Sequence, residues 1–231
     1  GFKVYDNSPR DLLPGIPRKS TPRTDEKPWS LPRIDPVDMT ETDEVRKDAG
    51  YTGKGQVVAV IDSGFDYQGV ELLDWVDFVE GSSKPVDPVG HGTHVAGDIM
   101  NLAPGAKIVV IRVMNEKGQG RPSDIIKGIQ WAIKNKDKYG IKVINLSLGS
   151  GPDGYPDYLH PINLAVKKAV KAGIVVVAAA GNSGPRSETI GSPADSNYSL
   201  TVGSALNEKT VSEFSSRGPT EDGLVKPDIM A

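Results

Sequence analysis

The stretch VVAVIDSG at residues 57–64 decides the fold class of this chain. Four of its first five residues are β-branched, and no polar residue interrupts them before the aspartate. A run that is apolar at every position predicts a strand buried on both faces, as in a parallel sheet. Similar runs follow at residues 108–111, 143–146 and 174–177, with a weaker one at 200–203. We therefore expect a parallel sheet that is covered on both sides.

Two helical patterns lie between these runs. Residues 125–133 and 162–170 place apolar side chains on one face and lysines largely on the other. Ser123 is expected to cap the first helix, while Pro161 suits the first turn of the second and Gly173 the position just past its end. Alternating strands and helices predict an α/β fold, a three-layer sandwich with a mostly parallel central sheet.

The bulk composition excludes several classes of protein. With 231 residues and a net charge of −3, the chain offers no reason to expect nucleic acid or an anionic membrane as a partner. No apolar run is long enough to span a bilayer. The absence of cysteine excludes disulfides, thiol catalysis and cysteine metal sites.

The first 36 residues differ from the rest of the chain. They hold seven prolines and show no apolar periodicity. We interpret residues 1–36 as an extended N-terminal arm or linker, and residues 37–231 as the folded domain.

Three glycine-rich polar strings carry the candidate chemistry. Asp62 directly follows the first strand, and Asn182, within AAGNSG at 179–184, lies shortly beyond the fourth. His91 begins HGTHVAG at 91–97, which could open a helix. Because ligands collect at the carboxyl edge of a parallel sheet, these side chains are expected to meet there.

These residue types suit acyl transfer. A histidine beside a buried carboxylate can act as a general base, and a fixed amide can donate a hydrogen bond to a developing oxyanion. Each residue also has a plainer interpretation. Asp62 alone could cap a turn, and Asn182 could adopt a left-handed turn conformation beside glycine.

The other histidines leave a further alternative. His91 and His94 stand three residues apart and could bind a metal in a metallohydrolase, although the usual His-Glu-x-x-His spacing is absent. A core histidine holding the helix start is the better interpretation of His94. His160 belongs to no constellation and is expected to stand where a helix begins.

Taken together, the motifs resemble those of the subtilisin-like serine proteases, the subtilases. The order aspartate, histidine, with serine expected last, is the subtilisin order. The resemblance extends over about residues 50–231. It also includes GKG at 53–55, NLSLG at 145–149, FSSRGP at 214–219 and KPDIMA at 226–231. It implies a subtilisin-like sandwich, incomplete at its C-terminus, and a peptidase domain over residues 37–231.

The resemblance implies a role for each motif in hydrolysing peptide bonds in proteins. Asp62 would orient His91, His91 would act as the general base, and Asn182 would contribute to the oxyanion hole. Two backbone edges would clamp an extended protein or peptide substrate: Gly118, Gln119, Gly120 and Ser147, Leu148, Gly149. Gly191 matches the base of the pocket for the residue before the scissile bond, so we expect tolerance of large apolar residues. The plainer alternative is that these glycines serve turns only.

The chain departs from the family pattern in two places. The nucleophilic motif Gly-Thr-Ser-Met-Ala is not in this sequence, and Ser215 and Ser216 match a structural loop upstream of it. We expect the serine on a missing C-terminal segment or a second chain, and the isolated 231 residues to be inactive. The alternative is a catalytically dead, peptide-binding or regulatory protein.

The second departure concerns calcium. Only residues 98–102 separate HGTHVAG from the next turn, so the calcium-binding loop that many relatives carry there is absent. Carboxylates between residues 35 and 48 could still bind calcium or simply be solvated. The resemblance implies no cofactor for the chemistry, and an extracellular location.

Overall fold

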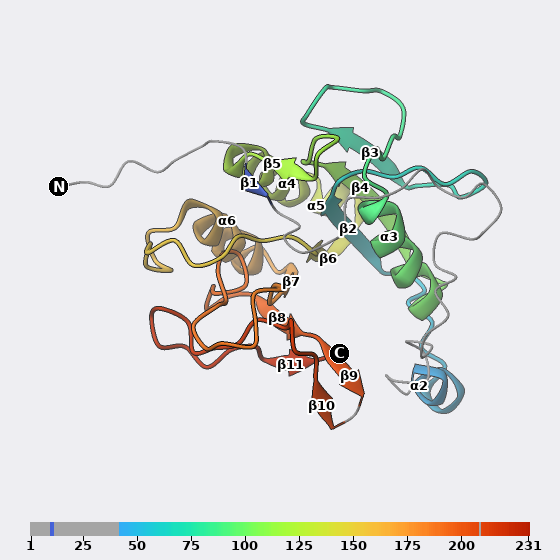
Figure 1. The fold of residues 1–231 in the computed structure, drawn as a ribbon. Helices are drawn as coiled ribbons and strands as arrows, with labels where there is room; N and C mark the ends of the chain where they lie inside the picture. Colours follow the sequence, from blue (N-terminus) through green and yellow to red (C-terminus); the bar gives the residue numbers. More distant parts are fainter. Residues whose placement is uncertain (1–9, 12–41, 208) are drawn as a thin grey trace.

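A computed structural model describes residues 10–11, 42–207 and 209–231 of the chain. Its centre is a seven-stranded sheet in the order β11-β8-β7-β6-β2-β4-β3, and every neighbouring pair in it is parallel (Figure 1). The strands are β2 (Val57–Asp62), β3 (Asp74–Asp77), β4 (Lys107–Arg112), β6 (Ile141–Leu146), β7 (Val175–Ala179), β8 (Leu200–Gly203) and β11 (Ile229–Met230). The predicted parallel sheet is confirmed.

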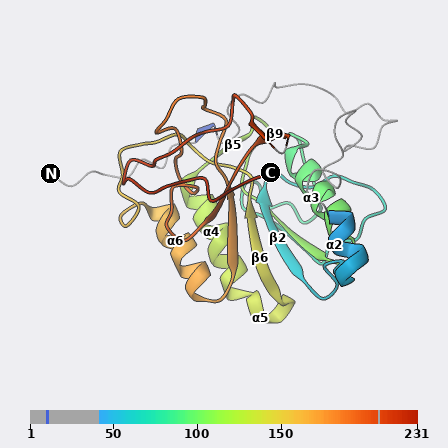
Figure 2. The same ribbon diagram turned by 90° about the horizontal axis from the view of Figure 1, so that it is seen from below.

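Helices cover both faces of this sheet. They are α2 (Thr42–Ala49), α3 (His91–Leu102), α4 (Pro122–Lys134), α5 (Lys136–Tyr139) and α6 (Pro161–Lys171). Figure 2 shows α4, α5 and α6 on one side of the sheet and α2 and α3 on the other. The apolar strand residues pack between these layers, with Ile61, Ile111 and Ile144 fully buried. The three-layer α/β sandwich is confirmed.

Helix cover on the α3 side is confined to one half of the sheet. Val176 and Ala178 of β7 are buried in the cluster that includes the apolar face of α6. Their neighbour Val175 points the other way and is 52% exposed, and Leu200 of β8 is 37% exposed. Within the described ranges, the sandwich therefore has three layers at β2 and β4 but two at β7 and β8.

The predicted ends of the second helix are confirmed, whereas the predicted start of the first helix is wrong. α6 begins at Pro161, and Gly173 follows its C-cap with a left-handed φ of 84°, both as predicted. α4 begins at Pro122 with Arg121 as N-cap, so the prediction of Ser123 as the cap is wrong. Proline displaces the start because its fixed φ and missing N–H fit the first helical position.

Some short elements were not predicted. β3, with the sequence DWVD, has no apolar run, and α2 has no continuous apolar stripe. β9 (Ala205–Asn207) and β10 (Thr210–Val211) form an antiparallel pair beyond β8. Each of these elements depends on its neighbours rather than on a strong local pattern.

The predicted N-terminal arm lies almost entirely outside the described residues. Its one described part is β1 (Arg10–Asp11), which pairs antiparallel with β5 (Gln119–Gly120). The division at residue 36 stays a prediction. Among the residues that were placed, none of the helices is both long and apolar enough to cross a membrane.

Candidate active site

The end of β2 and the start of α3 bring a carboxylate and an imidazole together. Asp62 is the last residue of β2, and His91 is the first of α3. The two elements approach closely: a Cβ at Gly92 would lie 2.3 Å from the carbonyl oxygen of Gly64. Glycine at position 92 therefore lets the helix start against the strand end. His91 Nδ1 lies 2.7 Å from Asp62 Oδ1.

Asp62 is buried and contacts both His91 and the backbone of the next residue. Its side chain is fully buried, whereas that of His91 is 19% exposed. Asp62 Oδ1 also accepts a hydrogen bond of 2.6 Å from the backbone N–H of Ser63, so the same oxygen contacts the backbone and the imidazole. Asp62 Oδ2 is buried and has no hydrogen-bond partner among the described residues.

The pair raises the pKa of His91 above its ordinary value of 6.5. Burial is the largest influence and would lower the pKa, but the charge and hydrogen bond of Asp62 outweigh it, with smaller contributions from Asp87 and Asp98. The protonated imidazole is thus stabilised in the folded state. The resulting stability is present below pH 6.5 and is lost as the pH rises through the higher folded-state pKa.

Asn182 lies on the same cavity as His91. The cavity has a volume of about 180 Å³. Positive φ at the AAGNSG turn falls on Gly181, at 102°, and not on Asn182, so the left-handed interpretation of the asparagine is wrong. The residues lining the cavity include four of the predicted substrate-binding positions: Ser147, Leu148, Gly149 and Gly191.

Ser216 holds the turn that carries Asn182. Its hydroxyl oxygen accepts a hydrogen bond from Ser183 N at 3.0 Å, and its N–H donates to Gly181 O at 2.9 Å. The hydroxyl oxygen of Ser215 likewise accepts from the backbone, at Ser204 N. Both serines are buried. Their contacts agree with the structural role expected from the FSSRGP string.

The first predicted substrate edge lies beside another chain segment. Gly118 closes a turn through its N–H to Asn115 O at 3.0 Å, with a φ of 69°. Gln119 and Gly120 then form β5. β1 pairs with β5, so that Arg10 lies opposite Gly120 and Asp11 lies opposite Gln119. This edge therefore accepts an extended antiparallel strand, although its three residues are not among those lining the cavity of His91 and Asn182.

Gly191 is restricted by the backbone beside it. A Cβ there would lie 2.3 Å from Ser150 O and 2.4 Å from Gly151 C. Ser150 N also donates to Ser192 O at 3.0 Å, which joins the two segments. Close backbone packing is therefore a reason for glycine at this position that is independent of pocket size.

Comparison with known proteins identifies the family. Residues 53–231 match the family model described as the subtilase family, Peptidase_S8. The chain belongs to the subtilase family. It is 40% identical over 213 residues to the serine protease AprX of Bacillus subtilis, covering 81% of this chain and 48% of AprX. It is 38% identical over 204 residues to subtilisin DY of Bacillus licheniformis, covering 83% of this chain and 69% of that protein.

A solved structure supports the same assignment. The crystal structure of a cold-adapted subtilisin-like serine proteinase matches with a TM-score of 0.65 and 32% identity. The match covers 78% of this chain and 64% of that one. The chain spans about half the length of relatives such as AprX.

The remaining histidines of this subtilase take structural contacts. His94 Nδ1 pairs with Asp98 Oδ2 at 3.1 Å, one turn further along α3, and the His94 side chain is 36% exposed. The interpretation of His94 as a core residue is therefore wrong, because its position on α3 points partly to solvent. His160 is the N-cap position of α6, as predicted, and its side chain is fully buried. The described part of the chain contains no group of three or more His, Asp or Glu side chains placed to hold a metal ion.

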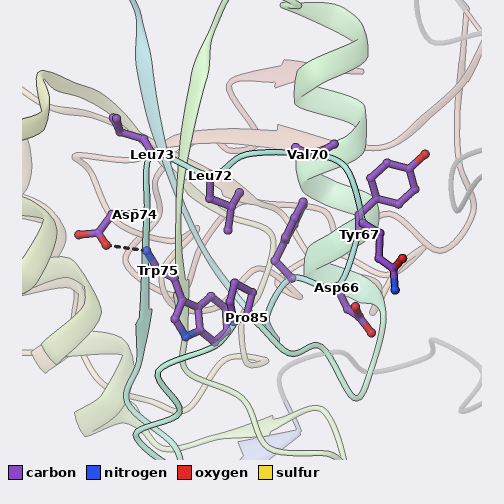
Figure 3. A pocket seen from close by; sticks show the side chains of 10 residues that line it. Asp66, Tyr67, Val70, Leu72, Leu73, Asp74, Trp75 and Pro85 are labelled. Atoms are coloured by element: carbon purple, nitrogen blue, oxygen red, sulfur yellow. Dashed lines mark hydrogen bonds between the residues drawn. The ribbon is translucent and has the colours of Figure 1, made fainter.

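A larger cavity of about 430 Å³ lies away from the predicted residues. Figure 3 shows it between the loop after β2 and the start of β3, with Tyr67, Leu72, Trp75 and Pro85 around it. None of the residues predicted to act in catalysis or substrate binding lines it. It is open to solvent and has no assigned role.

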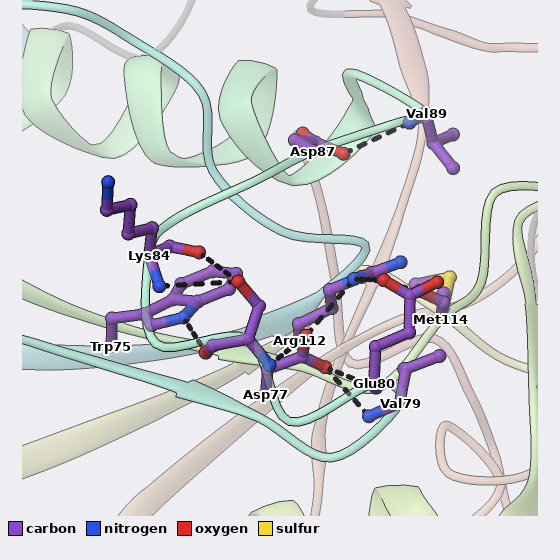
Figure 4. Close-up of polar contacts among 10 residues, drawn as sticks. Trp75, Asp77, Val79, Glu80, Lys84, Asp87, Val89, Arg112 and Met114 are labelled. Atoms are coloured by element: carbon purple, nitrogen blue, oxygen red, sulfur yellow. Dashed lines mark hydrogen bonds and ion pairs between the residues drawn. The ribbon is translucent and has the colours of Figure 1, made fainter.

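Sequence reasoning missed two charged groups at the same edge of the sheet. Arg112 ends β4 in register with Asp62 and is fully buried, with its Nη1 3.1 Å from both Asp77 Oδ2 and Glu80 Oε2 (Figure 4). Burial would raise the pKa of Asp77, but three backbone N–H donors and Arg112 lower it overall. The second group, Asp87, precedes α3. Its position four residues before His91 was the only feature of the sequence that could have indicated a role for Asp87 near the start of α3.

Proposed function

We propose that this chain supplies the general base and oxyanion site of a serine endopeptidase that hydrolyses peptide bonds in proteins. The observation that carries the proposal is the 2.7 Å contact between His91 Nδ1 and Asp62 Oδ1. These residues are 29 positions apart in the sequence, and they meet beside a cavity that Asn182 lines. The relatives named serine protease and subtilisin support the same chemistry.

In the proposed mechanism His91 Nε2 takes the proton from an attacking serine hydroxyl and returns it to the leaving amine. Asp62 holds the imidazole in the tautomer with the proton on Nδ1 and stabilises the imidazolium. Asn182 and a backbone N–H donate hydrogen bonds to the tetrahedral oxyanion. The chemistry uses only side chains and backbone groups, without a cofactor. Calcium would have a structural role only.

We place the attacking serine outside residues 1–231, on a C-terminal segment or second chain. Among the described residues, no serine hydroxyl lies within hydrogen-bond distance of His91. Ser216 lines the cavity, but it is 1% exposed and its hydroxyl oxygen accepts from Ser183 N. The partly exposed face of β7 and β8 offers a surface against which further chain can pack. By itself the 231-residue chain is proposed to be inactive.

We propose that a protein or peptide substrate binds as an added strand along Gly118–Gly120 and along Ser147–Gly149. The antiparallel pairing of β1 with β5 supports this, because an extended segment of the chain itself already pairs with that edge, and a substrate would take the place of β1 there. Large apolar residues before the scissile bond would enter the cavity beside Gly191. An extracellular location is proposed from relatives such as the minor extracellular protease Vpr.

The test combines active-site labelling with variants. A fluorophosphonate reagent applied to the protein purified from its source is expected to modify one serine outside residues 1–231, located by peptide mapping. Labelling of Ser216 or another serine within these residues would contradict the assignment. Peptide binding without labelling or turnover would instead favour the catalytically dead alternative.

The variants test each role against a matched control on the same helix. His91→Ala is expected to lower kcat by about 10⁶-fold and Asp62→Ala by about 10⁴-fold; these magnitudes come from subtilisin, a relative, and not from this structure. Asn182→Ala is expected to cost about 10²–10³-fold, again by analogy with subtilisin. His94→Ala, three residues along α3, should retain nearly full activity. Equal losses in His91→Ala and His94→Ala would contradict the proposed base.

A further inference from the structure

Asp87 joins the end of β2 to the first turn of α3. Its Oδ1 accepts hydrogen bonds from Ser63 Oγ at 2.8 Å, Gly90 N at 2.9 Å and Val89 N at 3.3 Å. Its Oδ2 accepts from Thr93 N at 2.8 Å and from Thr93 Oγ1 at 2.6 Å. Figure 4 shows this carboxylate turned toward the N–H of Val89. Five donors from three segments thus converge on one side chain.

These contacts replace the usual cap of the helix. The first N–H groups of an α-helix have no partner within the helix. The N-cap residue of α3 is Gly90, which has no side chain to accept them and has a left-handed φ of 81°. Instead, Gly92 N donates to Ser63 Oγ at 2.9 Å and Thr93 N donates to Asp87. The helix is therefore capped by the strand end and the preceding loop.

We propose that Asp87 is a positioning residue for His91. Ser63 directly follows Asp62, and Gly92 directly follows His91, so the chain of contacts from Asp87 through Ser63 to Gly92 links the immediate neighbours of the two reacting side chains. The carboxylate of Asp87 thereby fixes the separation of His91 from Asp62. This inference rests on the proposed role of His91 as the general base.

The contacts require a carboxylate at position 87. Backbone N–H donors approach both oxygens: Val89 and Gly90 at Oδ1, and Thr93 at Oδ2. An asparagine has the same shape, but one of the two oxygens is replaced by an NH₂ group, which is a donor. Whichever way the amide is turned, this NH₂ group would face a backbone N–H instead of accepting a hydrogen bond from it. Asp87→Asn therefore leaves donors unpaired and loosens the cap.

The negative charge of Asp87 also affects the pKa of His91. The negative charges of three carboxylates raise the pKa of the imidazole: Asp62 from β2, Asp87 from the loop, and Asp98 from α3 itself. Burial opposes them as the largest influence on the pKa of His91. Replacing Asp87 by asparagine removes one negative charge and loosens the contact with Asp62, and both effects lower this pKa.

An NMR titration of the 231-residue chain tests the proposal without requiring turnover. The pKa of His91 is read from its Hε1 shift, and its bond to Asp62 from the deshielded Nδ1 proton. Asp87→Asn is expected to lower the pKa and to broaden or remove the Nδ1 signal. Ser63→Ala, which leaves every charge in place, is expected to weaken the Nδ1 signal as well. Asp66→Asn is the matched control, because Asp66 is an exposed carboxylate in the adjoining loop.

The outcomes separate this inference from the proposed function. If Asp87→Asn and Ser63→Ala both leave the Nδ1 signal as it is in Asp66→Asn, Asp87 does not position His91. A lowered pKa in Asp87→Asn with an unchanged Nδ1 signal in Ser63→Ala would show a charge effect alone and would also overturn the proposal. A wild-type chain with no His91–Asp62 bond would contradict the proposed function itself. In the active protein, Asp87→Asn should lower kcat by about 10²-fold with little change in KM.

Discussion

Replacing Asp195 by asparagine is expected to change how the stability of this protein depends on pH. Burial, the largest influence, raises the pKa of Asp195 to about 6, and the charges of Asp157 and Asp153 add to this. A hydrogen bond from Asn163 Nδ2, at 2.8 Å, opposes the rise. Asn163 Oδ1 in turn accepts from the hydroxyl of Ser192, beside the candidate cavity.

The sign and size of the effect follow from this pKa. The folded state favours neutral Asp195, so its contribution to stability is present below the unfolded value of 3.8 and is lost as the pH rises through about 6. One pKa unit corresponds to about 1.4 kcal/mol, so the loss by pH 8 is at most ~3 kcal/mol. Asparagine stays neutral and keeps an acceptor for Asn163. Asp195→Asn should therefore be more stable than the wild type by about 1–3 kcal/mol at pH 8 and nearly equal to it at pH 4.

Urea unfolding at pH 4, 6 and 8 measures this difference. The matched control is Asp137→Asn, because the side chain of Asp137 is 96% exposed. The control should follow the wild type at all three pH values. An Asp195→Asn variant that is less stable than the wild type at pH 8, or that shows the same pH dependence, would refute the assignment of a partly buried carboxyl group with a raised pKa at this position.

Four further predictions concern the candidate site and its supports. Gly92→Ala would place a Cβ 2.3 Å from a backbone oxygen of the strand end and should lower the free energy of unfolding in urea by about 1–3 kcal/mol. Asp77→Ala leaves Arg112 buried without its buried partner and should cost about 3 kcal/mol in the same assay. Gly191→Val should lower the melting temperature, because its Cβ meets backbone at 2.3 Å; an unchanged melting temperature with altered substrate preference would favour an open pocket base. If neutral His91 is the base, as proposed, its raised pKa means that kcat/KM should rise with pH with a midpoint above 6.5; a midpoint below 6.5 would contradict this.

The predicted strands were correct where burial leaves a local signature. The run at residues 57–61 became β2, and the runs near 108, 143 and 174 became β4, β6 and β7. β3 and α2 were missed, because neither has an uninterrupted apolar run or stripe. Ser123 was assigned as a cap because a serine suits that position, but Pro122 at the preceding residue begins the helix.

The candidate site was predictable to the extent that its residues lie at strand ends. Asp62 ends a strand and Asn182 follows one. The order of apolar and polar residues in the sequence is enough to predict both positions. The sequence could not indicate that Gly92 is needed for contact with Gly64, or that Ser216 holds the turn of Asn182. Each of these contacts joins segments at least 28 residues apart, for which no local pattern exists.

The amino-acid order alone determined the α/β class, the polar groups at the carboxyl edge and the membership of a protease family, since each is expressed in short motifs or periodicity. Only the folded chain decided how near the imidazole lies to its carboxylate. That distance depends on Ser63 and Asp87, two small polar side chains that cap α3 from outside the helix. Their hydrogen bonds join residues that meet only where β2 and α3 pack together, so their role belongs to the tertiary structure.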